Sequence, residues 1–108
     1  EGVYRLRADK KQFSAIVTGE DLTAAGTLKA LQKLDCKVPG DVSVIGFNNL
    51  LLAEMITPSL TSVDNMGEAM AVAAVQTLYN VLQKNPTPPK TVLTPRLVPR
   101  ESTGGFTA

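Results

Sequence analysis

The chain has 108 residues, an apolar fraction of 44% and a net charge of +1. One small globular domain fits these values, whereas a disordered segment, a basic stripe for nucleic acid and a membrane-spanning apolar run do not. A single cysteine, Cys36, excludes a disulfide framework, and the absence of histidine removes the commonest general base and metal ligand.

The first third of the chain predicts a strand followed by a helix. Residues 1–12 are polar and charged without a clear period, so we expect an exposed lead-in with a short extended piece at 3–6. The run FSAIVT at 13–18 predicts the first strand. A helix is then expected from Asp21, in the N-cap position, to about residue 35. Its core-facing stripe is Ala24, Leu28, Leu31 and Leu34.

The stretch DVSVIGFNN at 41–49 predicts a second strand. Its β-branched run suits a strand that is buried on both faces of a parallel sheet. Strand, helix and strand then form a right-handed βαβ unit. Ligands of open α/β sheets lie beyond the carboxyl ends of the strands, so the loops at 18–21 and 47–49 form a candidate site. In the alternative, Asp21 only caps the helix and the two asparagines only make a turn.

The second half of the chain predicts two more helices and two more strands. Residues 50–56 are almost all apolar and form one or two helical turns, either as a partner surface or as ordinary core. A third strand at 60–63 leads into a helix from about 66 to 84, whose first half we expect to be buried on several sides. Two prolines restrict 91–98 to an edge strand or crossing segment. The tail at 101–105 is expected to fray.

The known catalytic motifs are absent from the sequence. It has no G-x-G-x-x-G fingerprint, no P-loop and no G-x-S-x-G elbow, and a serine–histidine–aspartate triad is impossible without histidine. Cys36 has no histidine partner, and the adjacent Glu20 and Asp21 are a poor acid–base pair. We therefore predict no catalytic residue, no metal site and no cofactor.

Four segments of the chain resemble, in the same order, the C-terminal part of the lactose-repressor/galactose-repressor family of bacterial transcription regulators. The family patterns are A-N-D-x-x-A-x-G, V-P-x-D-[VI]-S-[VI]-[VI]-G-[FY], P-P-L-T-T-[VI] and L-V-x-R-x-S-T. The matching segments here are EDLTAAG at 20–26, VPGDVSVIGF at 38–47, PSLTSV at 58–63 and LVPREST at 97–103. Each motif alone is weak, but four in register are specific.

The resemblance implies an α/β fold, namely part of a periplasmic-binding-protein-like domain with βαβ units and a mainly parallel sheet. It also implies a small effector, often a sugar, in a cleft between two lobes. Carried over by position, the effector contacts are Glu20, Asp21, Asn48 and Asn65. Glu20 stands where the family has asparagine, and Asn48 stands where it has aspartate. The helix matching 66–84 packs into the other lobe in the family.

Further expectations concern partners. The resemblance implies a homodimer, and its interface candidates here are Leu22, Ala25, Leu51, Leu52 and Met55. It places DNA contact in an N-terminal helix-turn-helix that these residues do not include. The chain lacks an initiator methionine, so we expect 1–108 to be the C-terminal fragment of an effector-binding domain. Such a regulator is cytoplasmic and needs no membrane. Segment 48–54 is most similar to maltose-operon repressors, which suggests a malto-oligosaccharide effector.

Two other functions compete with this interpretation. An exported sugar-binding protein of the same fold would need a signal peptide upstream, and none is visible within the chain. An enzyme on a doubly wound sheet would need a cofactor loop or a base, and the sequence offers neither. The four motifs in register favour the regulator.

Overall fold

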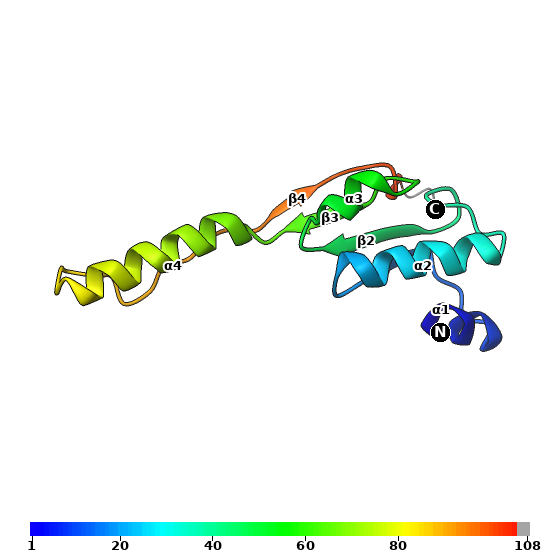
Figure 1. Ribbon diagram of the computed structural model, residues 1–108. Helices are drawn as coiled ribbons and strands as arrows, with labels where there is room; N and C mark the ends of the chain where they lie inside the picture. The colour runs from blue at the N-terminus through cyan, green and yellow to red at the C-terminus, as the bar shows by residue number, and fades with distance from the viewer. Residues whose placement is uncertain (106–108) are drawn as a thin grey trace.

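A four-stranded mixed sheet forms the centre of the molecule, as seen in a computed structural model that describes residues 1–105 (Figure 1). The strands lie in chain order, β1-β2-β3-β4. The first three run parallel and the fourth is antiparallel to its neighbour. Their bounds are Ala15–Val17 for β1, Ser43–Phe47 for β2, Thr61–Asp64 for β3 and Arg96–Val98 for β4. The mainly parallel α/β sheet is thus confirmed. Of the two alternatives for 91–98, an edge strand or a crossing segment, β4 is the edge strand.

The helix α2 (Asp21–Lys33) connects β1 to β2 and covers one face of the sheet. Ala24 and Leu31 are fully buried on the side that faces β2, and Leu28 is nearly so. Their spacing of three to four residues puts them on one face of the helix, which is the predicted core stripe. With Val44, Ala53 and Leu60 they form the hydrophobic core.

The short helix α3 (Leu51–Met55) follows β2 directly. The sequence left two alternatives for this segment, ordinary core packing or a partner surface, and the structure shows features of both. Ala53 is fully buried in the core, whereas Leu51 and Met55 are more than 70% exposed. This helix therefore contributes one residue to the core and also exposes apolar side chains to solvent.

The helix α4 (Gly67–Leu82) leaves the sheet at the end of β3 and projects away from it (Figure 1). The chain returns along it and re-enters the sheet as β4, so the molecule measures 59 × 26 × 24 Å. We call residues 66–95 the arm and the rest of the described chain the body. The prediction that the first half of this helix is buried is wrong, because none of its residues is buried. Its large apolar side chains are exposed instead: Met70, Val72, Val75, Leu78, Tyr79, Val81 and Leu82.

Residues 1–8 and 101–103 are more ordered than the sequence suggests. Residues 2–8 form the helix α1 (Gly2–Ala8), not an extended piece, since Val3 is buried against α2. Ser102 does not fray, because it is fully buried and pairs with Val44 through its backbone carbonyl and its hydroxyl group. A serine hydroxyl can bond to the backbone of a neighbouring strand in this way, which the polar tail sequence does not reveal.

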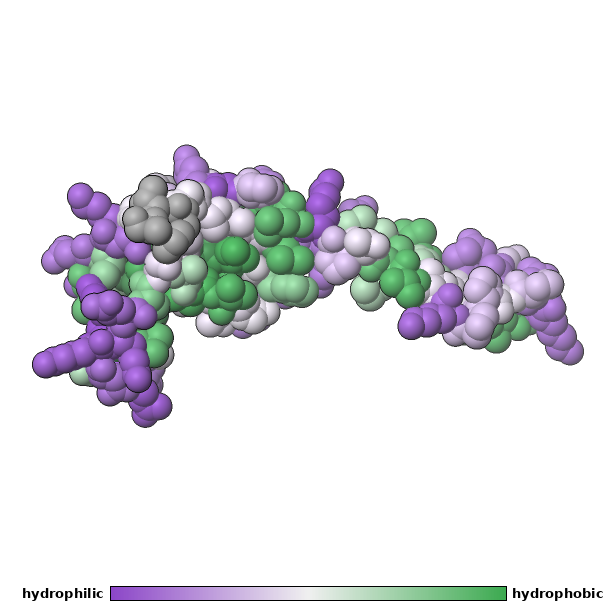
Figure 2. Space-filling view, turned by 180° about the vertical axis from the view of Figure 1, so that it is seen from behind, coloured by the Kyte–Doolittle hydropathy of each residue, from purple (hydrophilic) through white to green (hydrophobic). Residues whose placement is uncertain are grey.

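The central strand β2 is buried on one face only. Val44 and Gly46 point into the core, whereas Ser43 and Ile45 are half-buried and Phe47 is exposed. The expectation of burial on both faces is therefore corrected for the described residues. Apolar side chains reach the surface of the body as well as that of the arm (Figure 2). None of the helices formed by residues 1–105 has the length and apolar character to cross a membrane.

Candidate functional site

The loops that follow β1, β2 and β3 converge at one edge of the sheet. The backbone N–H of Thr18 bonds to the carbonyl of Ile45, and that of Asn48 bonds to the carbonyl of Val63. The carboxyl ends of neighbouring parallel strands meet at the same edge, so this convergence follows from the topology. The predicted meeting of the loops at 18–21 and 47–49 is confirmed.

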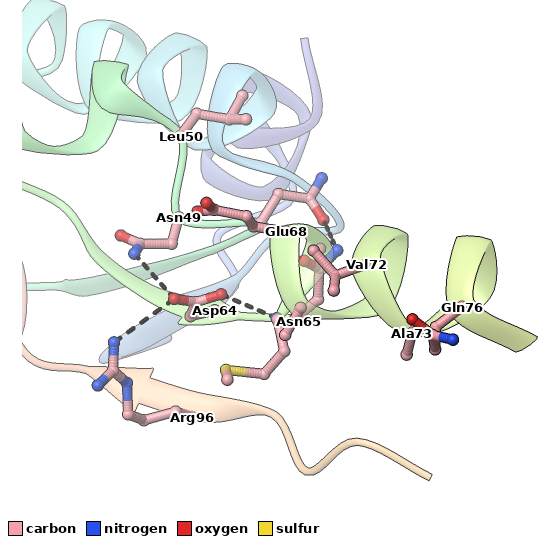
Figure 3. A pocket seen from close by; sticks show the side chains of 13 residues that line it. Asn49, Leu50, Asp64, Asn65, Glu68, Val72, Ala73, Gln76 and Arg96 are labelled. Atoms are coloured by element: carbon pink, nitrogen blue, oxygen red, sulfur yellow. Dashed lines mark hydrogen bonds and ion pairs between the residues drawn. The ribbon is translucent and has the colours of Figure 1, made fainter. Parts of the chain in front are cut away.

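A pocket of about 1200 Å³ opens at this edge, between the body and the start of the arm (Figure 3). Its floor consists of residues that follow β2 and β3, and one wall is the first turns of α4. The lining is rich in side-chain amides and contains three charged groups, Asp64, Glu68 and Arg96. The complete lining is Asn48, Asn49, Leu50, Asp64, Asn65, Met66, Gly67, Glu68, Ala69, Val72, Ala73, Gln76 and Arg96.

Two of the predicted effector contacts lie in this pocket and touch each other. Asn65 Nδ2 donates to Asn48 Oδ1 over 2.8 Å. Both side chains are half-buried. Within residues 1–105, the Asn48 amide N–H groups and the Asn65 amide oxygen make no hydrogen bond. The pair therefore leaves one donor group and one acceptor free to meet a ligand.

A polar network holds the floor of the pocket in place. Asn49 Oδ1 accepts from Arg100 Nη2 over 2.7 Å, and Asn49 Nδ2 lies 3.4 Å from Asp64 Oδ2. Arg96 pairs with the same carboxylate over 3.5 Å (Figure 3). The backbone N–H of Met66 is the main reason why the pKa of the Asp64 carboxyl lies below its ordinary value. Desolvation opposes this shift, while Asn49 and Arg96 add to it.

The other two predicted effector contacts are not among the residues that line this pocket. Glu20 is the exposed N-cap residue of α2, and its carboxylate accepts from the Thr23 hydroxyl over 3.3 Å. Asp21 is fully buried and is the first residue of α2, one position after the N-cap. Its carboxylate reaches across to the next loop and to β3. Its carboxylate therefore presents no open face to a ligand in this arrangement. The alternative that Asn48 and Asn49 only make a turn does not describe them fully, since both line the pocket.

The interface candidates lie on the outer side of the body. Leu22, Leu51 and Met55 are 62%, 71% and 73% exposed. Ala25 and Leu52 are half-buried. All of them belong to α2 or α3, which are in contact with each other. The structure thus leaves this face open to a partner.

Several site residues were not predicted from the sequence. Asp64 ends β3 at the same edge as Asn48, so the rule for parallel strands was sufficient to identify it. Arg96 was beyond sequence reasoning, because its place depends on the antiparallel register that pairs it with Asp64. Gln76 and Glu68 enter the pocket only because α4 starts directly at its rim.

A family described as the periplasmic binding protein-like domain matches residues 2–103. A transcriptional regulator of the helix-turn-helix type from Lachnoclostridium phytofermentans is 42% identical over 91 residues, which are 84% of this chain and 27% of that protein. The regulator MalR of Streptomyces coelicolor is 40% identical over 94 residues, covering 86% of this chain and 27% of its own length. The chain thus spans about a quarter of the length of these relatives.

Solved structures give the same result for the fold. A LacI-family transcriptional regulator from Arthrobacter, crystallised in complex with lactose, superposes with a TM-score of 0.83 at 36% identity. The match covers 94% of this chain and 38% of that one. The described residues therefore adopt part of a periplasmic-binding-protein-like domain.

Proposed function

This chain belongs to the LacI family of transcriptional regulators, and from that premise we propose that it is the effector-binding and dimerisation part of a bacterial sugar-responsive regulator, most simply a repressor. The effector binds in the pocket at the carboxyl ends of β2 and β3. The other wall of the cleft comes from parts of the protein outside these 108 residues. The relatives are regulators, so an exported binding protein is not favoured.

The observation that carries this proposal is the amide pair in the pocket. Asn48 and Asn65 bond to each other and still offer a free donor group and a free acceptor, as counted over residues 1–105. A sugar hydroxyl both donates and accepts, and an amide matches it in both directions. The lactose complex of the Arthrobacter relative supports a sugar for this fold.

The charges in the pocket favour a neutral ligand. Asp64 and Arg96 lie in one ion pair, which leaves Glu68 as the third charged group in the lining. Glu68 is exposed and stands in the first turn of α4, where a carboxylate is stabilised by the helix dipole. The net negative lining would repel a phosphorylated or acidic sugar, whereas it would not repel a neutral polyol.

A malto-oligosaccharide is the specific effector we propose. It rests on the similarity of segment 48–54 to maltose-operon repressors and on the 40% identity with the regulator MalR. Titration calorimetry of the intact protein with maltose and maltotriose tests it. We expect binding that Asn48→Ala and Asn65→Ala weaken about tenfold each, because each change removes amide bonds to the sugar. Asn85→Ala, which removes an exposed amide of the arm outside the pocket, is the control. The absence of heat with either sugar would exclude this effector.

The exposed face of α2 and α3 is proposed as the surface where two copies meet. Leu22, Leu51 and Met55 give it an apolar surface, flanked by Ala25 and Leu52. Met55→Arg should convert a dimer of the intact protein into a monomer, because a buried unpaired charge is costly. Sedimentation velocity reads this out, with Lys90→Glu on the arm as the control. A Met55→Arg protein that remains dimeric would contradict this interface.

The remaining functions follow from the family. We propose that DNA contact belongs to a helix-turn-helix elsewhere in the protein, and that the regulator works in the cytoplasm. No catalytic step and no cofactor are assigned to these residues, since the proposed role needs only reversible binding.

A further inference from the structure

The buried carboxylate of Asp21 is held by groups from two other elements. Asp21 stands in the first turn of α2 and is fully buried. Its Oδ2 accepts the backbone N–H of Leu50 over 2.7 Å. Its Oδ1 accepts the hydroxyl of Ser62, from β3, over 2.6 Å. One side chain of α2 thus joins the loop after β2 to the neighbouring strand.

The same hydroxyl extends this connection by one residue. Ser62 Oγ accepts the backbone N–H of Asn49 over 3.0 Å while it donates to Asp21. Two consecutive backbone N–H groups, of Asn49 and Leu50, therefore end on the Asp21–Ser62 pair. The preceding N–H, of Asn48, bonds to the carbonyl of Val63. All three amides of the loop are fixed to groups outside it.

The loop needs this support because of its backbone conformation. Asn48 and Asn49 have φ values of 97° and 50°, in the left-handed region that L-residues seldom adopt. This conformation turns both side chains into the pocket, where Asn48 meets Asn65 and Asn49 meets Asp64. The two asparagine side chains thus enter the pocket from the loop whose amides Asp21 and Ser62 accept.

An independent observation comes from Gly46 in β2. A Cβ atom at this position would overlap Asp21 Oδ1 and would come within 2.8 Å of Leu60 Cδ2. Its φ is not positive, so the glycine is not required by the backbone. Glycine is needed here for steric reasons, since only a residue without a Cβ atom leaves room for the Asp21 carboxylate next to the strand.

We propose that Asp21 is a positioning residue: through Ser62 and the Leu50 amide it sets the conformation of the Asn48–Leu50 loop and so aims the two asparagines at the effector. The proposal rests on the proposed function, because it assigns to that pocket a residue that does not touch the ligand. It also replaces the expectation that Asp21 contacts the effector directly. Asp21 is the first residue of α2, and the residue that follows it, Leu22, lies on the proposed dimer face.

The first test needs no ligand. Amide hydrogen exchange is measured by NMR on the intact protein, comparing wild type with Asp21→Asn and Ser62→Ala. Asn has the shape of Asp but replaces one acceptor by a donor. We expect the Asn49 and Leu50 amides to exchange about tenfold faster in Asp21→Asn. The Leu50 N–H loses its charged acceptor, and the Ser62 hydroxyl that accepts the Asn49 N–H loses the carboxylate to which it donates. In Ser62→Ala only Asn49 should show the full effect. The Val44 amide, in the core strand, should not change.

The control is Asp41→Asn. Asp41 also accepts a backbone N–H, that of Lys37 over 2.8 Å, but it lies in the turn before β2 and outside the pocket. It should leave exchange at 48–50 unchanged. Equal acceleration at Val44 and Asn49 in Asp21→Asn would reduce Asp21 to a residue of general stability and overturn the proposal, as would unchanged exchange at 49 and 50.

The second test uses maltose as the probe in titration calorimetry. If wild type binds it, Asp21→Asn should weaken binding about tenfold, although the side chain touches no ligand. Unchanged affinity with a loosened loop would overturn the positioning role. If wild type fails to bind maltose, the malto-oligosaccharide proposal falls, and hydrogen exchange at Asn49 and Leu50 decides the role of Asp21 separately.

Discussion

The body and the arm are both rich in apolar residues, yet only the body buries them. In α2 the side chains of Ala24 and Leu31 are fully buried, whereas no residue of α4 is. Residues 69–83 contain no charged side chain at all. An apolar stripe therefore specifies burial only when the topology supplies a surface for it to cover.

The topology explains the difference. α2 connects two parallel strands, and such a crossover has to pack back on the sheet. α4 instead precedes an antiparallel strand, so the chain can run outward and return along itself before β4. Since the family resemblance places the helix matching 66–84 in another lobe, we expect the arm to be covered in the whole protein.

We expect the largest difference between body and arm when a large apolar side chain is truncated in each. Leu31→Ala should lower the free energy of unfolding of the isolated chain by about 2–5 kcal/mol, because it leaves a cavity in the core. Leu78→Ala on the arm, which is 60% exposed, should change it by no more than about 0.5 kcal/mol. Urea denaturation measures both. Equal losses would show that the arm is packed in solution.

Two glycines of the body differ in the space around them. Gly46→Ala should destabilise the protein by about 1–3 kcal/mol, since the added methyl group displaces Asp21 and Leu60. Gly26→Ala is the matched control on α2, because apart from the adjoining residues and backbone of the helix itself no described atom lies within 4 Å of its added Cβ. It should stabilise the helix by about 0.5–1 kcal/mol. Thermal unfolding reads both, and a stabilised Gly46→Ala protein would contradict the close fit.

The arm should make the isolated chain self-associate. Val75 and Tyr79 lie one helical turn apart and are 69% and 57% exposed, so pairing of two arms removes apolar surface from water. Val75→Gln should weaken association about tenfold by light scattering, since each buried apolar side chain contributes strongly. Val17→Gln, a 77% exposed position of the body, is the control and should have less effect. A monodisperse wild-type monomer would count against this prediction.

The smallest expected effect is a pH dependence at the junction of body and arm. Asp64 has a lowered pKa when folded, chiefly because of the Met66 N–H, so its stabilising contribution is complete above its unfolded pKa of about 4. It is lost as the pH falls through the lower, folded pKa. Asp64→Asn should therefore reduce the loss of stability between pH 4 and pH 2, measured by urea denaturation.

Glu101 offers the same test inside the body. The Ser59 N–H lowers the pKa of the Glu101 carboxyl in the same direction, so Glu101→Gln should also flatten the acid limb. Only Asp64→Asn should in addition alter ligand affinity, because Glu101 does not line the pocket. Identical effects of both changes on affinity would argue against a specific role for the pocket floor.

The order and type of most elements can be predicted from local sequence patterns. The strand at 43–47, the helix at 21–33 and the edge position of 96–98 follow from periodicity, β-branched runs and prolines, which act locally. The motifs in register identified the family. The rule for parallel strand ends brought Asn48 to the right edge of the sheet. These features need no knowledge of distant contacts.

Tertiary structure alone decided the rest. Helix α1 exists because Val3 finds a place against α2, and Ser102 is ordered because β2 offers it backbone partners. Asp21 looked like a cap or a ligand contact, yet its carboxylate binds Leu50 and Ser62, which are 29 and 41 residues away in the chain. A carboxylate accepts whichever donors the fold brings near it, and those donors are set by strand register. Only the folded arrangement therefore distinguishes a residue that touches the effector from one that positions its neighbours.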